Sequence, residues 1–184
     1  SEEGIRILDA FNQPVPVALR NNPLKQDREA LLQQLRELEI EGTPSAECDN
    51  GILTEGGALI QNDLFRKGHY SVQGISSQMA IQALAPKAGS KVLDMCAAPG
   101  GKTTGIAERM GDCGTVEAWD IHPHRTELIR RNAERLGLHS VETEVKDATV
   151  FYPELEGCYD AVVADVPCSG LGTIPVKPEI KLRD

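Results

Sequence analysis

Residues 91–103 read KVLDMCAAPGGKT, and this stretch decides the fold class. The run Lys91–Cys96 is short and apolar, which is typical of a buried strand. Two glycines then lead into a helix that we expect from about Lys102 to Met110. A strand that passes through a glycine-rich turn into a helix is the ligand-binding corner of open α/β sheets, and the unpaired N–H groups of that helix favour an anionic group.

The sequence after this turn continues the alternation of strands and helices. Thr115–Asp120 predicts a second strand, and a helix follows that begins near Pro123 and ends at Gly137. Val141–Lys146 alternates as an edge-side strand does, and Ala161–Val166 is fully apolar, as in a buried parallel strand. We therefore predict a Rossmann-like α/β core with right-handed crossovers, truncated after its fourth parallel strand.

The sequence before the turn has a different pattern. Val15–Asn22 predicts an extended segment, and an amphipathic helix beginning near Asp27 places Leu31, Leu35 and Leu38 on one face. Glycine-rich, irregular sequence with short strand candidates follows. This part of the chain is predicted to be a small α+β unit.

A change in composition near Ser71 marks a boundary between these two patterns. A helix is expected from Ser76 to Ala85, because the proline that follows disfavours helical backbone in the residue before it. We therefore divide the chain into an α+β extension, residues 1–70, and the first part of a Rossmann-like domain, residues 71–184.

The composition excludes several classes of protein. A net charge of −9 argues against a surface coated in positive charge for nonspecific nucleic-acid binding. No apolar run is long enough to span a bilayer, and the five scattered cysteines form no Cys-x-x-Cys pair of a structural zinc site. We expect a cytoplasmic protein with reduced thiols, no membrane association and no metal, whose oligomeric state stays open. Both ends of the chain look like cuts.

Three kinds of ligand compete for the glycine-rich loop. A phosphate-binding P-loop needs a glycine where this chain has Cys96, and the Gly-x-Gly-x-x-Gly of dinucleotide folds is absent. A nucleoside without phosphates is the third. Asp120, Asp147 and Asp165 end three predicted strands, and such carboxylates repel phosphates but attract a sulfonium cation. This charge argument favours S-adenosylmethionine.

The same three strand ends suggest how that nucleoside is held. Asp120 is placed to accept hydrogen bonds from ribose hydroxyls, and Asp147 to hold the exocyclic amine of adenine. Ile121 is a candidate floor for the adenine ring. Trp119 is interpreted as a packing residue and not as a platform for base stacking.

The last predicted strand ends in Asp165-Val166-Pro167-Cys168. A thiolate there would add to C6 of a pyrimidine, which makes C5 nucleophilic enough to accept a methyl group. The alternative is a buried, inert cysteine, and the position of Cys168 alone does not decide between the two.

Taken together, these motifs resemble the RNA cytosine-5 methyltransferase family, and within it the members that modify bacterial 16S ribosomal RNA. The likeness rests on CAAPGGKT at residues 96–103 and DVPCSG at residues 165–170. It extends to LRNN at residues 19–22, YSVQ at residues 70–73 and KPEIK at residues 177–181, so that it covers nearly the whole chain.

The resemblance implies a set of site residues. The contacts to S-adenosylmethionine would be Cys96, Ala97, Ala98, Pro99, Gly100, Gly101, Lys102, Asp120, Asp147 and Asp165. Cys168, with Asp165 beside it, would be catalytic and would assist release of the methylated RNA. The family's nucleophile lies in a Thr-Cys motif, which this sequence lacks. We therefore expect that the chain does not methylate RNA by itself.

The RNA itself would be contacted by basic side chains near the pocket. Arg20, Lys25 and Lys67, with Arg66 and His69, are the candidates for holding phosphates, and for each the alternative is a solvated surface charge. The target cytosine must be flipped out or single-stranded. A transfer RNA substrate, or a noncatalytic RNA-binding module with a cofactor fold, stays open as an alternative function.

Overall fold

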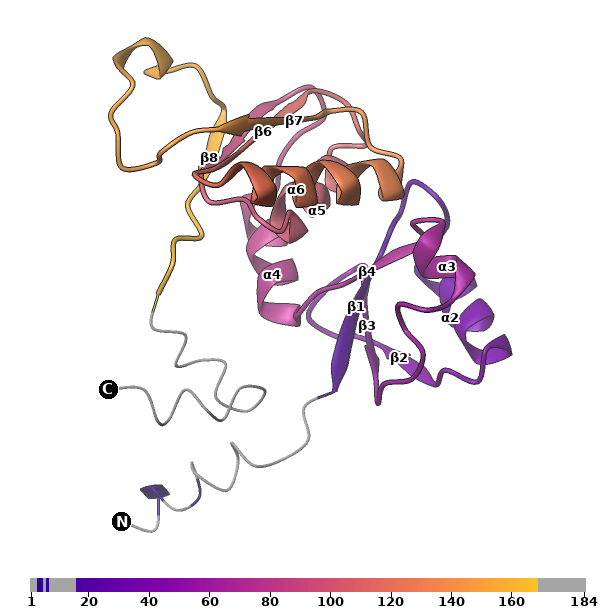
Figure 1. Cartoon of the computed structure of the whole chain (residues 1–184). Coiled ribbons are helices and arrows are strands. Elements are labelled where there is room, and N and C mark those ends of the chain that lie inside the picture. Colours follow the sequence, from indigo (N-terminus) through magenta and orange to yellow (C-terminus); the bar gives the residue numbers. More distant parts are fainter. Residues whose placement is uncertain (1–2, 5, 7–15, 169–184) are drawn as a thin grey trace. The chain divides into compact units, whose positions relative to one another are not determined.

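The computed structural model of the chain describes residues 3, 4, 6 and 16–168 (Figure 1). Residues 17–166 form one compact unit, and residues 1–16 with 167–184 form another. The first of these units holds two separate sheets. The segments 169–170 and 177–181, which carry part of the family resemblance, lie outside the described residues.

Sheet A is antiparallel, with the strand order β2-β3-β1-β4. The strands are β1 (Val17–Asn21), β2 (Gly42–Pro44), β3 (Gly51–Thr54) and β4 (Tyr70–Val72). β1 confirms the extended segment expected at Val15–Asn22, and β3 lies in the glycine-rich stretch that is expected from the sequence to hold short strands. β2 and β4 were not predicted, because strands of three residues are too short to show a period. The proposed boundary after residue 70 falls within β4.

Two helices pack on sheet A, namely α2 (Arg28–Glu37) and α3 (Asp63–Arg66). α2 begins where the sequence predicts, because the Asp27 carboxylate accepts a hydrogen bond from the Ala30 N–H at 2.7 Å. The prediction for Leu38 is wrong: the helix ends one residue before it, and Leu38 is exposed. The core of this half consists of Leu19, Leu31, Leu32, Leu35, Ile40, Ile52, Leu59 and Tyr70.

Sheet B is parallel, with the strand order β7-β6-β5-β8, which confirms the predicted α/β core. Its strands are β5 (Lys91–Asp94), β6 (Thr115–Asp120), β7 (Val141–Val145) and β8 (Ala161–Val163). β8 is shorter than predicted and is not buried, since Val162 is 51% exposed. The reason is its place at the edge of the sheet in the described part of the chain.

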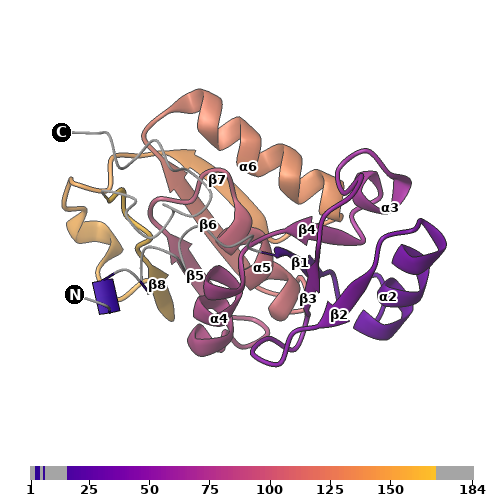
Figure 2. The same ribbon diagram turned by 90° about the horizontal axis from the view of Figure 1, so that it is seen from below.

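Three helices cover one face of sheet B (Figure 2): α4 (Ile75–Leu84), α5 (Gly101–Arg109) and α6 (Pro123–Leu136). Their apolar side chains share one core with alternate residues of the strands. The buried members are Ile81, Val92, Ile106, Ala107, Met110, Val116, Ala133, Leu136 and Leu138. A short 3-10 helix, η1 (Pro153–Leu155), precedes β8. Among the described residues, no helix combines the length and apolar character needed to cross a bilayer.

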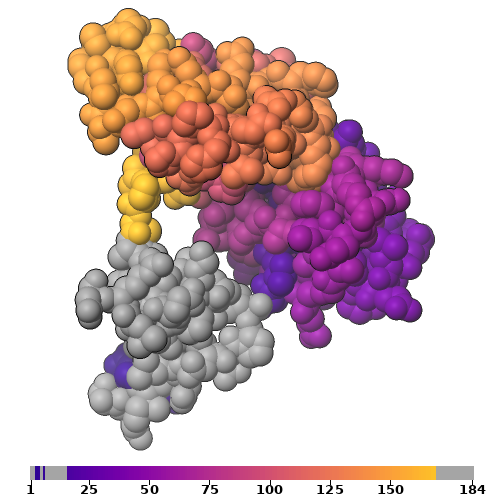
Figure 3. All heavy atoms as spheres, in the orientation of Figure 1, coloured from indigo at the N-terminus to yellow at the C-terminus, as the bar shows by residue number. Residues whose placement is uncertain are grey.

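The two sheets are joined by polar contacts within the same unit. The Asn22 side-chain amide donates to the carbonyls of Gly68 and Leu136, and Arg135 of α6 donates to the Phe65 carbonyl at 2.7 Å. Figure 3 shows the side chains of the two halves in direct contact, purple against orange. Sheet A is therefore attached to the helices that cover sheet B.

Candidate functional site

The loop at the carboxyl end of β5 is fixed by its neighbours in sheet B. The Ala97 N–H donates to the Trp119 carbonyl at 2.8 Å, which ties the loop to β6. The Asn132 side chain of α6 donates to the Pro99 carbonyl at 3.0 Å. The loop is thus held at both ends before any ligand binds.

Gly100 makes the turn from this loop into α5 possible. Its φ of +100° lies in the region that favours glycine, and a Cβ there would lie 3.1 Å from Ile129 Cα. α5 begins at the next residue, Gly101, and the first N–H groups of a helix have no intrahelical acceptor. The predicted helix start is confirmed to within one residue, and the expectation that its N–H groups favour an anionic group stays a prediction.

Asp94 is the most deeply buried carboxylate at this edge of the sheet, with 1% of its surface exposed. Its Oδ2 accepts a hydrogen bond from Thr103 Oγ1 at 2.7 Å, whereas its Oδ1 is buried and has no partner among the described residues. Burial raises the pKa of this carboxyl. We did not select Asp94 from the sequence, although it ends a strand as Asp120 does.

The carboxylates of Asp120 and Asp147 follow the two neighbouring strands. Asp120 is buried, its Oδ1 accepts the His122 N–H at 3.0 Å, and its Oδ2 lies 3.4 Å from Arg125 Nη1. Asp147 is partly exposed and accepts the N–H and hydroxyl of Thr149, which lower the pKa of its carboxyl. Both carboxylates have fixed orientations and further acceptor capacity.

Asp165 follows β8 and pairs with Lys102. Lys102 Nζ lies 2.5 Å from Asp165 Oδ2 and also donates to Ser77 Oγ at 3.3 Å. The lysine that a P-loop would aim at phosphates is therefore engaged by a carboxylate and a hydroxyl. This arrangement argues against a nucleotide phosphate at the loop.

The carboxylates converge electrostatically on Cys96. Burial raises the pKa of the Cys96 thiol, and the negative charges of Asp94, Asp120 and Asp165 raise it further. Cys96 therefore stays protonated and is a poor nucleophile. The same field stabilises a cation and repels a phosphate, as the charge pattern of the sequence predicts.

A pocket of about 260 Å³ opens at this loop. It is lined by Val72, Gln73, Ser77, Asp94, Cys96, Ala97, Ala98, Pro99, Gly101, Lys102 and Asp165. Most of the predicted loop residues therefore share one pocket, with Gly100 buried behind them. Asp120, Ile121 and Asp147 are not in its lining: Asp120 ends β6, the strand next to β5, Ile121 follows it and is 52% exposed, and Asp147 follows β7, one strand farther from β5. The residues that the sequence analysis missed are Val72, Gln73, Ser77 and Asp94.

Arg20 is not an RNA contact in this structure, and that prediction is wrong. The side chain is 4% exposed, and its guanidinium donates to Glu108, Thr104, Gln73 and the Gly101 carbonyl. All of its donor nitrogens are engaged inside the protein, so none remains for a phosphate.

The other two predicted RNA contacts, Lys25 and Lys67, are exposed. Both lie within electrostatic reach of His69, since burial and the charges of the two lysines lower the pKa of the His69 imidazole. The three side chains form a local basic cluster in an otherwise acidic chain.

Cys168 and the two histidines at the start of α6 are also placed by the structure. Cys168 is exposed and belongs to the unit of residues 1–16 and 167–184, so the structure gives no distance from its thiol to the pocket. His122 stands at the N-cap of α6 and its ring stacks on His124 at 5.5 Å. Within residues 16–168 and the other described positions, no three His, Cys, Asp or Glu side chains gather to bind a metal.

Two family models match the chain. The model of 16S rRNA methyltransferase RsmB/F matches residues 81–184, and the ferredoxin-like domain model of RsmF/B-like methyltransferases matches residues 1–61. Trp119 is 1% exposed and packs edge to face on Tyr152 with the ring centroids 5.5 Å apart, so it is a packing residue as the sequence predicts.

Individual proteins are similar over nearly the whole chain. A probable ribosomal RNA small subunit methyltransferase B of Synechocystis is 41% identical over 94% of this chain and 40% of its own length. A 28S rRNA (cytosine-C(5))-methyltransferase of Mus musculus is 35% identical over 97% of this chain and 23% of its own. A methyltransferase homolog protein from Pyrococcus horikoshii superimposes with a TM-score of 0.84 at 33% identity, over 94% of this chain and 57% of that one. The chain thus spans less than half the length of these two curated relatives.

Proposed function

The chain belongs to the 16S rRNA methyltransferase RsmB/F family, and from this membership we propose that it takes part in methyl transfer from S-adenosylmethionine to C5 of a cytosine in ribosomal RNA. The names of the relatives give ribosomal RNA as the substrate class, and bacterial 16S rRNA is the first substrate to test. The proposal is supported most by the carboxylates of Asp94, Asp120 and Asp165, whose charges all act on Cys96 in the loop after β5.

The residues of this edge fit the cofactor. S-adenosylmethionine supplies, when bound, a methyl group on a sulfonium cation, which the field of Asp94, Asp120 and Asp165 stabilises. Asp120 is assigned to the ribose hydroxyls, with Ile121 and Asp147 at the adenine. The unpartnered Oδ1 of Asp94 is a buried acceptor in the pocket, and we assign it to the ammonium group of the cofactor's amino-acid end.

The roles of the remaining site residues follow from the same proposal. Lys102 holds the Asp165 carboxylate at the pocket, where the target base would enter. Cys168 keeps the role of assisting release of the methylated RNA. Lys25 and Lys67 hold RNA phosphates, and Arg20 is removed from that set because it is buried.

The cofactor proposal is tested by calorimetric titration of the chain with S-adenosylmethionine, with ATP and NAD as competitors for the same loop. We expect binding of S-adenosylmethionine alone, and a loss of at least about tenfold in affinity in Asp120→Asn, because ribose loses a charged acceptor. Circular dichroism checks that the variant is folded. Binding of ATP in preference to S-adenosylmethionine would refute the proposal.

The RNA contacts are tested separately by the salt dependence of RNA binding. Lys25→Ala with Lys67→Ala should flatten the plot of log K against log salt by about 0.7–0.9 for each phosphate that the protein no longer neutralises. Lys87→Ala is the matched control, because Lys87 is an exposed lysine in the α4–β5 connection away from the basic cluster. Equal slopes in the double variant and the control would exclude Lys25 and Lys67 as phosphate contacts.

A further inference from the structure

Gln73 follows the last strand of sheet A, yet its side chain lines the pocket at the loop after β5 of sheet B. It directly follows β4, and its side chain and backbone together are only 9% exposed. Its N–H donates to the Ala18 carbonyl at 3.0 Å, and its carbonyl accepts from Gln78 Nε2 at 2.8 Å. The backbone at Gln73 is therefore fixed on both sides.

The side-chain amide of Gln73 has one possible orientation. Arg20 Nη1 donates to it, and since arginine has no acceptor, the atom that receives this bond must be the amide oxygen, Oε1. The amide nitrogen, Nε2, then lies 3.3 Å from the place that a Cβ of Gly101 would occupy. In the described part of the chain, Gln73 Nε2 donates to no protein acceptor, so a donor of a largely buried side chain is left at the pocket, beside the start of α5.

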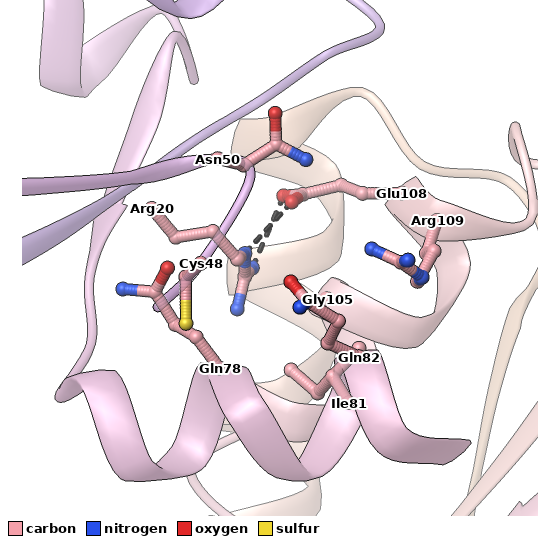
Figure 4. Close-up of a pocket in the computed structure, with 9 residues that line it drawn as sticks. All are labelled: Arg20, Cys48, Asn50, Gln78, Ile81, Gln82, Gly105, Glu108 and Arg109. Atoms are coloured by element: carbon pink, nitrogen blue, oxygen red, sulfur yellow. Dashed lines mark hydrogen bonds and ion pairs between the residues drawn. The ribbon is translucent and has the colours of Figure 1, made fainter. Parts of the chain in front are cut away.

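The Arg20 guanidinium is itself fixed in position by hydrogen bonds to other parts of the fold. Its Nε and Nη2 donate to the two carboxylate oxygens of Glu108 at 2.8 and 3.1 Å, and Nη1 also donates to the Gly101 carbonyl at 2.7 Å. Figure 4 shows the guanidinium directed at Glu108 above α4. Arg20 therefore orients Gln73 from the side away from the pocket.

We propose that Gln73 Nε2 donates a hydrogen bond to the carboxylate of the amino-acid moiety of S-adenosylmethionine, with Arg20 as its positioning residue. The inference rests on the proposed function and adds the residue that recognises one end of the cofactor. Gly101, which has no side chain, leaves the space between Nε2 and the first N–H groups of α5 open for an anion.

The surrounding side chains support a zwitterionic ligand at this place. Lys102 is engaged by Asp165 and Ser77, so the ammonium of the lysine is not the partner of the carboxylate. Asp94 Oδ1, in the same pocket, is a buried acceptor with no partner among the described residues, which suits an ammonium group. A donor from Gln73 and an acceptor from Asp94 thus match the two charges of an α-amino acid.

The test compares S-adenosylmethionine with its decarboxylated analogue, which differs from it only by the missing carboxylate. The wild-type chain is also titrated with 5′-methylthioadenosine, which lacks the whole amino-acid end and the sulfonium charge. The decarboxylated analogue should bind about tenfold more weakly than S-adenosylmethionine, as expected when a hydrogen bond to a charged acceptor is lost. Equal affinities of the wild-type chain for these two ligands would overturn the inference.

Gln73→Glu tests the residue itself. The substitution keeps an oxygen for Arg20 but replaces the Nε2 donor by a second acceptor that repels the carboxylate. We expect the affinity for S-adenosylmethionine to fall by about tenfold or more, while that for 5′-methylthioadenosine is retained. Gln73→Met, which adds no charge, should likewise lose affinity for S-adenosylmethionine and keep its affinity for 5′-methylthioadenosine.

A parallel loss of affinity for both ligands in these variants would show that Gln73 is merely structural and would overturn the inference. Failure of the wild-type chain to bind S-adenosylmethionine at all would instead overturn the proposed function on which the inference rests.

Discussion

Two buried carboxylates in this chain lie close in sequence but have different surroundings. Glu108 of α5 is 3% exposed, and Arg20 donates to both of its oxygens. Asp94 at the end of β5 is 1% exposed, and Thr103 donates to only one of its oxygens. Burial raises the pKa of both carboxyls. The first region joins two sheets, and the second keeps one buried carboxylate oxygen that has no hydrogen-bond partner among the described residues.

The difference follows from the cost of burying charge. A buried carboxylate is tolerated when a cation and hydrogen bonds compensate the lost hydration. Glu108 has that compensation within the fold, so it is a structural residue. Asp94 has a hydrogen bond to only one of its oxygens, from Thr103. A buried acceptor without a donor is typical of a binding site.

The largest effect is expected when Glu108 loses its cation. Arg20→Met leaves the carboxylate buried and unpaired, which should lower the free energy of unfolding by about 3–5 kcal/mol in urea titrations. The double variant Arg20→Met with Glu108→Met removes both charges and should recover most of that loss. If the single variant unfolds at the wild-type urea concentration, the paired region is not what joins the sheets.

A smaller effect is expected at Gly105, which lies against the same pair. A Cβ there would lie 2.5 Å from Ile81 Cδ1 and 2.7 Å from Arg20 Nη1, and Arg20 is fixed by its hydrogen bonds. Gly105→Ala should therefore destabilise by about 1–3 kcal/mol, although alanine favours helices. Gly74→Ala is the matched control, because no atom lies within 4 Å of its Cβ position. A Gly105→Ala chain that is more stable than the wild type would show that the interface can relax.

Asp94→Asn should stabilise the chain at neutral pH, in contrast to the two destabilising changes above. Because burial raises the folded-state pKa of Asp94, its charged form opposes folding, and stability is lost as the pH rises through that pKa. The variant should be about 0.5–1 kcal/mol more stable than the wild type at pH 7 and equal to it near the ordinary pKa of about 3.9. Chemical denaturation across this pH range measures the difference. A destabilised Asp94→Asn at pH 7 would mean that Asp94 is compensated within the fold as Glu108 is.

The smallest effect is expected at exposed charges on α6. Arg130 and Arg131 donate to Glu127 and lower the pKa of its carboxyl to about 2. All three side chains are solvated, and water and salt screen such pairs. Glu127→Gln should leave the urea midpoint at pH 7 unchanged within error. If Glu127→Gln shifts the urea midpoint as much as Asp94→Asn does, burial is not the reason why the two substitutions are expected to differ in their effect on stability.

Much of sheet B could be predicted from the sequence. Thr115–Asp120 and the helix from Pro123 have the bounds expected, because long periodic segments with proline and glycine at their ends mark their own limits. β2 and β4, with three residues each, carry no such signal. They exist because β3 and β1 supply their hydrogen bonds.

Candidate site residues could be selected from the sequence where their position follows from one continuous segment. They could not be selected where their position depends on the packing of two segments that are distant in sequence. The loop from Cys96 to Lys102 and the strand-end aspartates could be selected because they follow strands, and their role as cofactor contacts stays a prediction. Arg20 was interpreted as an RNA contact because its partner, Glu108, is 88 residues away in sequence. Gln73 was missed for the same reason: its position in the pocket depends on how sheet A packs on α5.

The most direct test of this account is a calorimetric titration of Asp94→Asn with S-adenosylmethionine at neutral pH, beside its thermal unfolding. The account predicts a chain that unfolds at the wild-type temperature or above it, with an affinity for S-adenosylmethionine that is about tenfold lower. An unchanged affinity together with a lower unfolding temperature would contradict it, because Asp94 would then be a structural carboxylate like Glu108.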